Sequence, residues 1–222
     1  MNILAIENST AHFSAALKTD RTVLQCSVLY GQTSEDFTAL LDFLFRQASL
    51  NVSDVDLFVM GTGPGSFTGL RTSLSIIKGF HAALGKPCMG IPGYAGITRQ
   101  YAVAETPCAV IFDAKKNKIY GGVYCRQGDN VIRMIQEDVY DLDDFLVNRC
   151  GTDYLFAGES IKFVEKIRDI YPFAPVLSDT AYPEPRFLID QALQRCREGD
   201  PGDTPDNIEL LYIHPDTCNV RI

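Results

Sequence analysis

The segment 61–71, with the sequence GTGPGSFTGLR, packs four glycines and one proline in front of a long helical pattern. Glycine-rich turns that open a helix bind phosphate groups in many enzymes, because backbone N–H groups there point at the anion. This segment matches neither the dinucleotide fingerprint G-x-G-x-x-G, nor the phosphate loop G-x-x-x-x-G-K-[ST], nor the hydrolase elbow G-x-S-x-G. The pattern favours a structural loop with a capped, closely packed helix entry. The residues of this loop are Gly61, Gly63, Pro64, Gly65, Ser66 and Gly69.

The side chains that could hold a metal ion are scattered along the chain. The three histidines, His12, His81 and His214, are far apart, and none stands at a useful spacing from another type of ligand. The seven cysteines form no C-x-x-C pair, which is typical of reduced thiols in a cytosolic protein. The sequence therefore predicts no metal site.

The composition limits the partners that the chain can bind. Its 222 residues, of which 46% are hydrophobic, suffice for one large domain or two small ones. A formal charge of -8 argues against a protein that binds nucleic acid alone, because phosphate contacts need clustered Lys and Arg. The chain begins without the basic segment of a signal peptide, and no apolar run reaches the roughly 20 residues that span a bilayer. We expect a cytoplasmic protein that contacts no membrane and reaches RNA only through a partner.

Strand and helix patterns alternate in the first half of the chain. Three short strands, joined by polar turns, come first, and a helix follows them. A buried strand then runs into the glycine loop, and the longest helical pattern begins directly after it. The predicted elements are strands over 3–8, 12–18, 23–29, 56–61 and 87–91, and helices over 34–48, 67–84 and 93–102.

The opening arrangement is used a second time after residue 105. An apolar strand ending in an acid, a tight turn and two further strands recur, with Asp113 in the place of Glu7. Helical patterns follow over 142–149, 160–170 and 184–196, and strand patterns over 153–158 and 208–213. We therefore predict an α/β fold of two related halves, an N-terminal half over 1–104 and a C-terminal half over 105–222.

The predicted helix 67–84 has two apolar stripes, whereas a surface helix needs only one. The first contains Phe67, Leu70, Leu74, Ile77, His81 and Leu84, and the second contains Gly69, Ile76, Phe80 and Ala83. One stripe can pack on the sheet of its own half, so the other requires a further partner. We assign the first stripe, the helix 34–48 and two flanking basic residues to a protein interface, and expect Leu74→Glu to abolish pairing or, if the stripe is internal, to unfold the chain. The residues of this predicted interface are Leu40, Leu41, Leu44, Phe67, Leu70, Arg71, Leu74, Ile77, Lys78 and His81.

Several segments of the chain resemble one protein family. MNILAIENST, GTGPGSFTGLRTSLSIIKGF and FDAKKNKIYGGVY resemble the TsaB (YeaZ) family of bacterial threonylcarbamoyladenosine-biosynthesis subunits, and occur in the family's order. The terminal LLYIHP is similar to the family's ending. The first turn, residues 7–10, reads ENST where many members have Asp-Thr-Ser-Thr, and the chain ends with Ile213-His214 where Leu-Arg is usual.

The resemblance implies the fold of the actin, Hsp70 and sugar-kinase superfamily. It also implies a non-catalytic scaffold subunit that activates a catalytic TsaD-like paralogue. With a TsaE-like ATPase, that complex moves a threonylcarbamoyl group from its adenylate to N6 of the adenosine beside the anticodon of ANN-decoding tRNAs. Alone, the chain is expected to form a homodimer.

The resemblance further implies that the chain lacks the metal site of its catalytic paralogue and needs no cofactor. The catalytic paralogue holds a metal through an H-x-x-x-H pair on its first long helix, whereas the corresponding YGQTSEDFTALL contains no histidine. No cofactor is expected, although weak nucleotide binding at a partner interface is compatible with the fold. The residues of this nucleotide cleft would be Glu7, Ser9, Thr10 and Asp113.

Two other functions stay open at this point. An ATP-dependent sugar-type kinase of the same fold would need a recognisable phosphate loop and a catalytic aspartate. A metallopeptidase related to the M22 peptidases would bind zinc, so elemental analysis of the purified chain distinguishes it from a scaffold protein.

Overall fold

The first sheet has five strands, in the order β3-β2-β1-β4-β5. β1 pairs antiparallel with β2, and β2 with β3, whereas β4 runs parallel to β1 and β5 runs parallel to β4. All five residues of β1 are buried, as are those of β4, because the strands at the centre of the sheet are covered on both faces. The strands are β1 (Ile3–Glu7), β2 (His12–Lys18), β3 (Val23–Leu29), β4 (Leu57–Gly61) and β5 (Cys88–Ile91).

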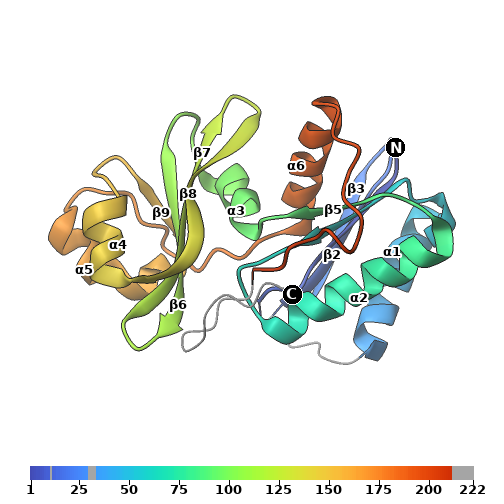
Figure 1. Ribbon diagram of the computed structural model, residues 1–222, viewed down its shortest axis with the longest axis horizontal. Helices are drawn as coiled ribbons and strands as arrows, with labels where there is room; N and C mark the ends of the chain where they lie inside the picture. Colours follow the sequence, from blue (N-terminus) through green and yellow to red (C-terminus); the bar gives the residue numbers. More distant parts are fainter. Residues whose placement is uncertain (11, 30–33, 212–222) are drawn as a thin grey trace. The chain divides into compact units, whose positions relative to one another are not determined.

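Helices cover both faces of this sheet (Figure 1). Leu4 and Ile6 of β1 point toward α1 and α2, whereas Ile3 and Ala5 point toward α6, as the alternation of a strand requires. The helix α2 begins after Ser66, whose hydroxyl accepts a hydrogen bond from the Gly69 N–H at 3.2 Å, and ends at a left-handed Gly85. The elements outside the strands are α1 (Ser34–Ala48), the 3₁₀ turn η1 (Val52–Asp54), α2 (Phe67–Leu84) and α6 (Pro185–Arg197).

The second sheet repeats this arrangement with four strands, in the order β8-β7-β6-β9. Three antiparallel strands are again followed by a parallel one, β9 beside β6. α4 and α5 pack on one face, and α3 packs on the other. The elements are α3 (Gly93–Tyr101), β6 (Pro107–Lys115), β7 (Lys118–Gln127), β8 (Asn130–Asp141), α4 (Leu142–Arg149), β9 (Leu155–Gly158), the 3₁₀ turn η2 (Ser160–Phe163) and α5 (Val164–Ile170). The predicted α/β fold of two related halves is therefore confirmed.

The chain divides into two units at other positions than the sequence suggested. The computed structural model describes residues 1–10, 12–29 and 34–211. Within them, unit 1 comprises Met1–Gly93 and 183–211, and unit 2 comprises Tyr94–Tyr182. The predicted boundary at 104/105 is thus corrected at both ends of unit 2. The physical reason is α6, whose Leu188 and Ile189 cover the second face of the first sheet.

The strand predicted over 208–213 is also corrected. Residues 208–211 belong to no strand; Ile208 is buried against the first sheet and the Leu211 N–H donates to the Thr62 carbonyl at 3.0 Å. The remainder of that prediction, and Ile213 and His214, lie outside the described residues. No helix among the described residues has the length and apolar character that crossing a membrane requires.

Candidate partner-binding site

The glycine loop packs directly on the turn that follows β1. The Ser66 N–H donates to the Ser9 carbonyl at 2.7 Å, and a Cβ at Gly65 would lie 2.1 Å from the same oxygen. A Cβ at Gly69 would lie 1.8 Å from the Asn8 carbonyl oxygen. Gly63 has a φ of +93°, which disfavours other residues. Glycine is therefore required so that α2 can approach the first turn closely.

Glu7 is the last residue of β1, and its carboxyl group lies next to Gly61 of the glycine loop. Its side chain is buried: Oε1 accepts a hydrogen bond from the Ser9 N–H at 2.6 Å, while Oε2 has no hydrogen-bond partner among the described residues. A Cβ at Gly61 would lie 1.8 Å from Oε2, so glycine makes room for the carboxyl group. Burial raises the pKa of Glu7, although the hydrogen bonds from Ser9 and Asn8 work in the opposite direction. Ser9 is likewise buried, and Thr10 is partly buried.

Asp113, the counterpart of Glu7, lies in unit 2 and has a different environment. Its carboxylate accepts hydrogen bonds from the Lys115 N–H at 2.8 Å and from Lys115 Nζ at 2.7 Å. Burial acts to raise the pKa of Asp113, but the hydrogen bonds and charge of Lys115 outweigh it and hold the pKa below its usual value. Glu7 and Asp113 therefore have opposite pKa shifts.

The structure corrects the predicted protein interface. Leu70 and Ile77 of α2 are fully buried in the core of unit 1, and Leu74 packs against the same core. Leu40 and Leu44 of α1 are buried there as well. Leu70, Leu74 and Ile77 of the first stripe thus pack on their own sheet, and the expected result of Leu74→Glu becomes unfolding rather than loss of pairing.

An apolar groove of about 950 Å³ lies between α1 and α2. Its apolar lining includes Ile76 and Phe80, which belong to the second stripe of α2. Of the predicted interface residues, Leu41, Phe67 and Arg71 line it. The complete lining is Phe37, Thr38, Leu41, Asp42, Phe45, Val52, Phe67, Thr68, Arg71, Thr72, Ser75, Ile76, Gly79 and Phe80. The sequence prediction missed Ile76 and Phe80 as lining residues, because it assigned the first stripe to the interface. The second stripe, which contains both residues, was the signal that could have found them.

The α2 wall of the groove contains several small residues, among them Thr72, Ser75 and Gly79. The hydroxyls of Thr72 and Ser75 donate to the carbonyls one turn earlier, at 2.9 and 2.8 Å, so their polar groups are satisfied within the helix. A Cβ at Gly79 meets no heavy atom of the described chain within 4 Å. This wall can therefore accept the side chains of another element at close range.

The rim of the groove is partly apolar. Phe67 is 50% exposed, and the Arg71 guanidinium lies 4.0 Å from the centre of its ring. Exposed aromatic residues together with arginine are typical of binding hot spots.

The last two predicted interface residues, Lys78 and His81, are outside the groove lining. Lys78 forms an ion pair with Asp206 at 3.0 Å, and the His81 ring donates to the Lys86 carbonyl at 2.8 Å, where it helps to close the helix. In the described part of the chain, no three His, Cys, Asp or Glu side chains gather as ligands of a metal ion would.

One family model and several known proteins match the chain. A family model described as TsaD: tRNA N6-adenosine threonylcarbamoyltransferase matches residues 31–196. The chain is 31% identical over 127 residues to an uncharacterised protein of Mycobacterium tuberculosis, a match that covers 55% of this chain and 59% of that protein. It is 24% identical over 148 residues to the tRNA threonylcarbamoyladenosine biosynthesis protein TsaB of Bacillus subtilis, covering 66% of this chain and 65% of that one. The matches thus span about three fifths of the length of these relatives.

A solved structure shows the same fold over nearly the whole chain. It is a Pseudomonas aeruginosa protein described as uncharacterised, with similarity to peptidase YeaZ. The TM-score is 0.82 at 24% sequence identity, and the match covers 96% of this chain and 99% of that one. At this identity the likeness concerns the fold and not the chemistry.

Proposed function

We propose a function for this chain, which belongs to the TsaB (YeaZ) family within the wider TsaD-type family. It is the non-catalytic scaffold subunit of a complex that forms threonylcarbamoyladenosine in tRNA. Its task is to bind and activate a catalytic TsaD-like paralogue. A TsaE-like ATPase and tRNA join the complex, and the tRNA is contacted through the partners. The chain forms a homodimer when the paralogue is absent.

The groove between α1 and α2 is the observation that carries this proposal. A monomer rarely leaves a contiguous apolar surface of this kind without a partner for it. Small residues on α2 leave room for an approaching helix, and the aromatic side chains on α1 and α2 offer apolar area to bury. The interface therefore consists of the groove lining, in place of the buried leucines of the first stripe.

The absence of histidine from YGQTSEDFTALL supports a partner role over catalysis. Neutral imidazoles are common ligands of transition metals, and the paralogue uses a histidine pair at this position. The negative charge of the chain, -8, is compatible with contact to tRNA through a more basic partner. Weak nucleotide binding near Glu7, Ser9 and Thr10 stays a prediction.

The test is reconstitution with purified proteins and threonylcarbamoyl-adenylate. This chain alone is expected to leave an ANN-decoding tRNA unmodified, and the TsaD-like enzyme is expected to gain activity when this chain is added. Product formed by this chain without the enzyme would overturn the scaffold proposal.

Gly79→Leu probes the groove without disturbing the monomer. The new side chain enters the groove, so affinity for the TsaD-like enzyme should fall at least about tenfold, equivalent to about 1.4 kcal/mol. The melting temperature should hold or rise, because glycine inside a helix costs roughly 0.5–1 kcal/mol. Ala82→Leu is the matched control, since Ala82 is also exposed on α2 but lies outside the groove lining. Unchanged affinity of the Gly79→Leu variant, measured by calorimetry, would place the interface elsewhere.

A further inference from the structure

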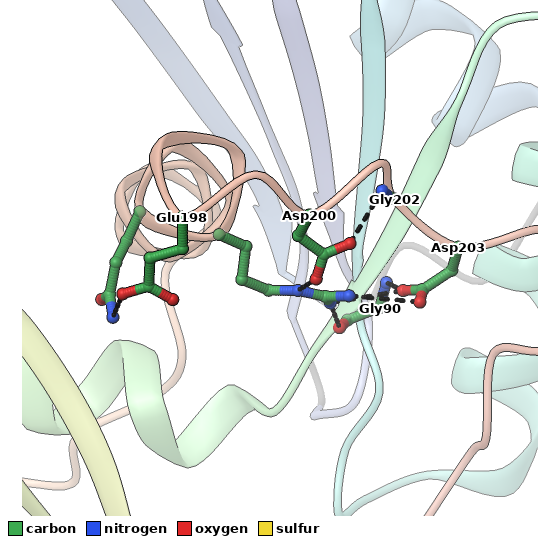
Figure 2. Close-up of polar contacts among 7 residues, drawn as sticks. Gly90, Glu198, Asp200, Gly202 and Asp203 are labelled. Carbon is green, nitrogen blue, oxygen red and sulfur yellow. Dashed lines mark hydrogen bonds and ion pairs between the residues drawn. The ribbon is translucent and has the colours of Figure 1, made fainter.

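The segment that follows α6 is tied to the first sheet by one arginine. We call residues 200–211 the strap. Arg195 of α6 binds Asp200 through Nε at 2.7 Å, and its two other nitrogens reach Asp203 at 3.2 and 3.3 Å. Arg195 Nη1 also donates to the Gly90 carbonyl of β5 at 3.1 Å. Figure 2 shows the carboxylates of Asp200 and Asp203 directed toward the strand that carries Gly90.

Asp203 completes the connection to β5, which is the last strand of its sheet. Its N–H donates to the Cys88 carbonyl at 2.6 Å, and its carboxylate accepts a hydrogen bond from the Gly90 N–H at 2.9 Å. The side chains of Arg195 and Asp203 are only 29% and 25% exposed, so water screens this forked ion pair less than a pair on the surface. Arg195 is therefore the group that joins α6, β5 and the strap.

Beyond Asp203, the strap packs along α2. Ile208 and Leu210 belong to the same core cluster as Ile77 of that helix. Asp206 forms an ion pair with Lys78 of α2 at 3.0 Å. The chain then reaches the glycine loop before α2, where the Leu211 N–H donates to the Thr62 carbonyl. The strap thus contacts α2 or its entry loop at several points.

The same helix supplies a wall of the partner-binding groove. Thr72, Ile76 and Phe80 of α2 line the groove, and Lys78 of the same helix pairs with Asp206 of the strap. Ile76, Ile77 and Phe80 also pack in the core cluster that contains Ile208 of the strap. A helix moves as a rigid element, so a change on the strap side also shifts the groove side. We infer that Arg195, which does not line the groove, is a positioning residue for the binding of the TsaD-like partner and acts through the strap and α2. This inference rests on the proposed function of the groove.

The test replaces Arg195 with Met, which keeps the apolar stem and removes the fork. Affinity of the full chain for the TsaD-like enzyme should fall by about tenfold, within the range usual for coupled sites. Amide exchange, followed by mass spectrometry, should accelerate in β5, the strap and α2, but not in unit 2. Arg195→Lys should recover only part of the affinity, because one ammonium group cannot replace the four hydrogen bonds of the guanidinium. Arg186→Met is the matched control, since Arg186 lies at the other end of α6 and pairs with Glu184 instead.

The outcomes separate this inference from the proposed function. If Arg195→Met binds the enzyme like the wild type while Gly79→Leu does not, the groove proposal stands and the role of Arg195 is overturned. If the wild-type chain does not bind the enzyme at all, the proposed function fails, and amide exchange still decides whether Arg195 supports α2. Unchanged exchange in α2 of the Arg195→Met variant overturns the inference in either case.

Discussion

At the scale of single residues, Glu7 is the most unusual group in unit 1. The carboxyl group is buried, one oxygen lacks a hydrogen-bond partner in the described chain, and its pKa is raised by burial. A raised pKa in the folded state means that the folded protein holds this proton more tightly than the unfolded chain. Stability therefore falls as the pH rises from the unfolded pKa, near 4.5, through the folded one.

Glu7→Gln should remove this pH dependence. The amide fills the same volume and cannot ionise, so we expect a higher melting temperature than the wild type at pH 8. The difference should shrink as the pH falls toward 4.5, because more of the wild-type carboxyl group is then protonated. Thermal unfolding followed by circular dichroism across this range provides the measurement. A melting temperature below that of the wild type at pH 8 would show that the charge of Glu7 is compensated by a group not identified in the structure.

At the scale of one element, α2 contains a buried glycine, Gly69, and an exposed one, Gly79, and replacing them should have opposite effects on stability. Gly69 faces the Asn8 carbonyl, and a Cβ there would lie 1.8 Å from its oxygen, whereas Gly79 faces open space. Gly69→Ala should destabilise the chain by about 1–3 kcal/mol, because backbone has to move. Gly79→Ala should stabilise it by about 0.5–1 kcal/mol. Urea unfolding of both variants measures the difference, and two changes of the same sign would contradict the close packing of α2 on the first turn.

The sequence was sufficient to place α2 but not to orient it. Ser66 and Gly85 mark the two ends of the helix, and both caps are present in the structure. Two apolar stripes of similar strength left open which one faces the sheet. Only the structure shows that Leu70 and Ile77 are buried and that Ile76 and Phe80 line the groove. The groove itself depends on the packing of α1 beside α2, which no local pattern encodes.

At the scale of the whole molecule, each unit has cores built from its own residues. The clusters around α1, α2 and α6 contain residues of unit 1, and those around α3, α4 and α5 contain residues of unit 2. The internal repeat was visible in the sequence because both copies are continuous. The assignment of α6 to unit 1 was not visible in the sequence, because an amphipathic pattern does not show which sheet the helix covers.

Phe145→Ala should test how independent the units are. The ring is fully buried in unit 2, where it packs against Tyr140 and fills the space above Gly121. Its loss should cost about 3–5 kcal/mol. We expect faster amide exchange across residues 94–182, with protection retained in α1 and α2 and with binding to the TsaD-like enzyme preserved. Equal loss of protection in both units would show that they unfold together.

The return of the chain to unit 1 has a consequence for synthesis on the ribosome. The described part of unit 2, residues 94–182, is continuous, so it can fold as soon as residue 182 has left the exit tunnel. Unit 1 cannot, because α6 is made after residues 94–182, and until then Ile3, Ala5 and Val59 have no helix to cover them. At a synthesis rate of about 5 to 20 residues per second, this apolar sheet face stays uncovered for several seconds. The nascent chain therefore passes through a stage at which residues 94–182 can be folded while the first-made unit still exposes an apolar sheet face that chaperones can bind.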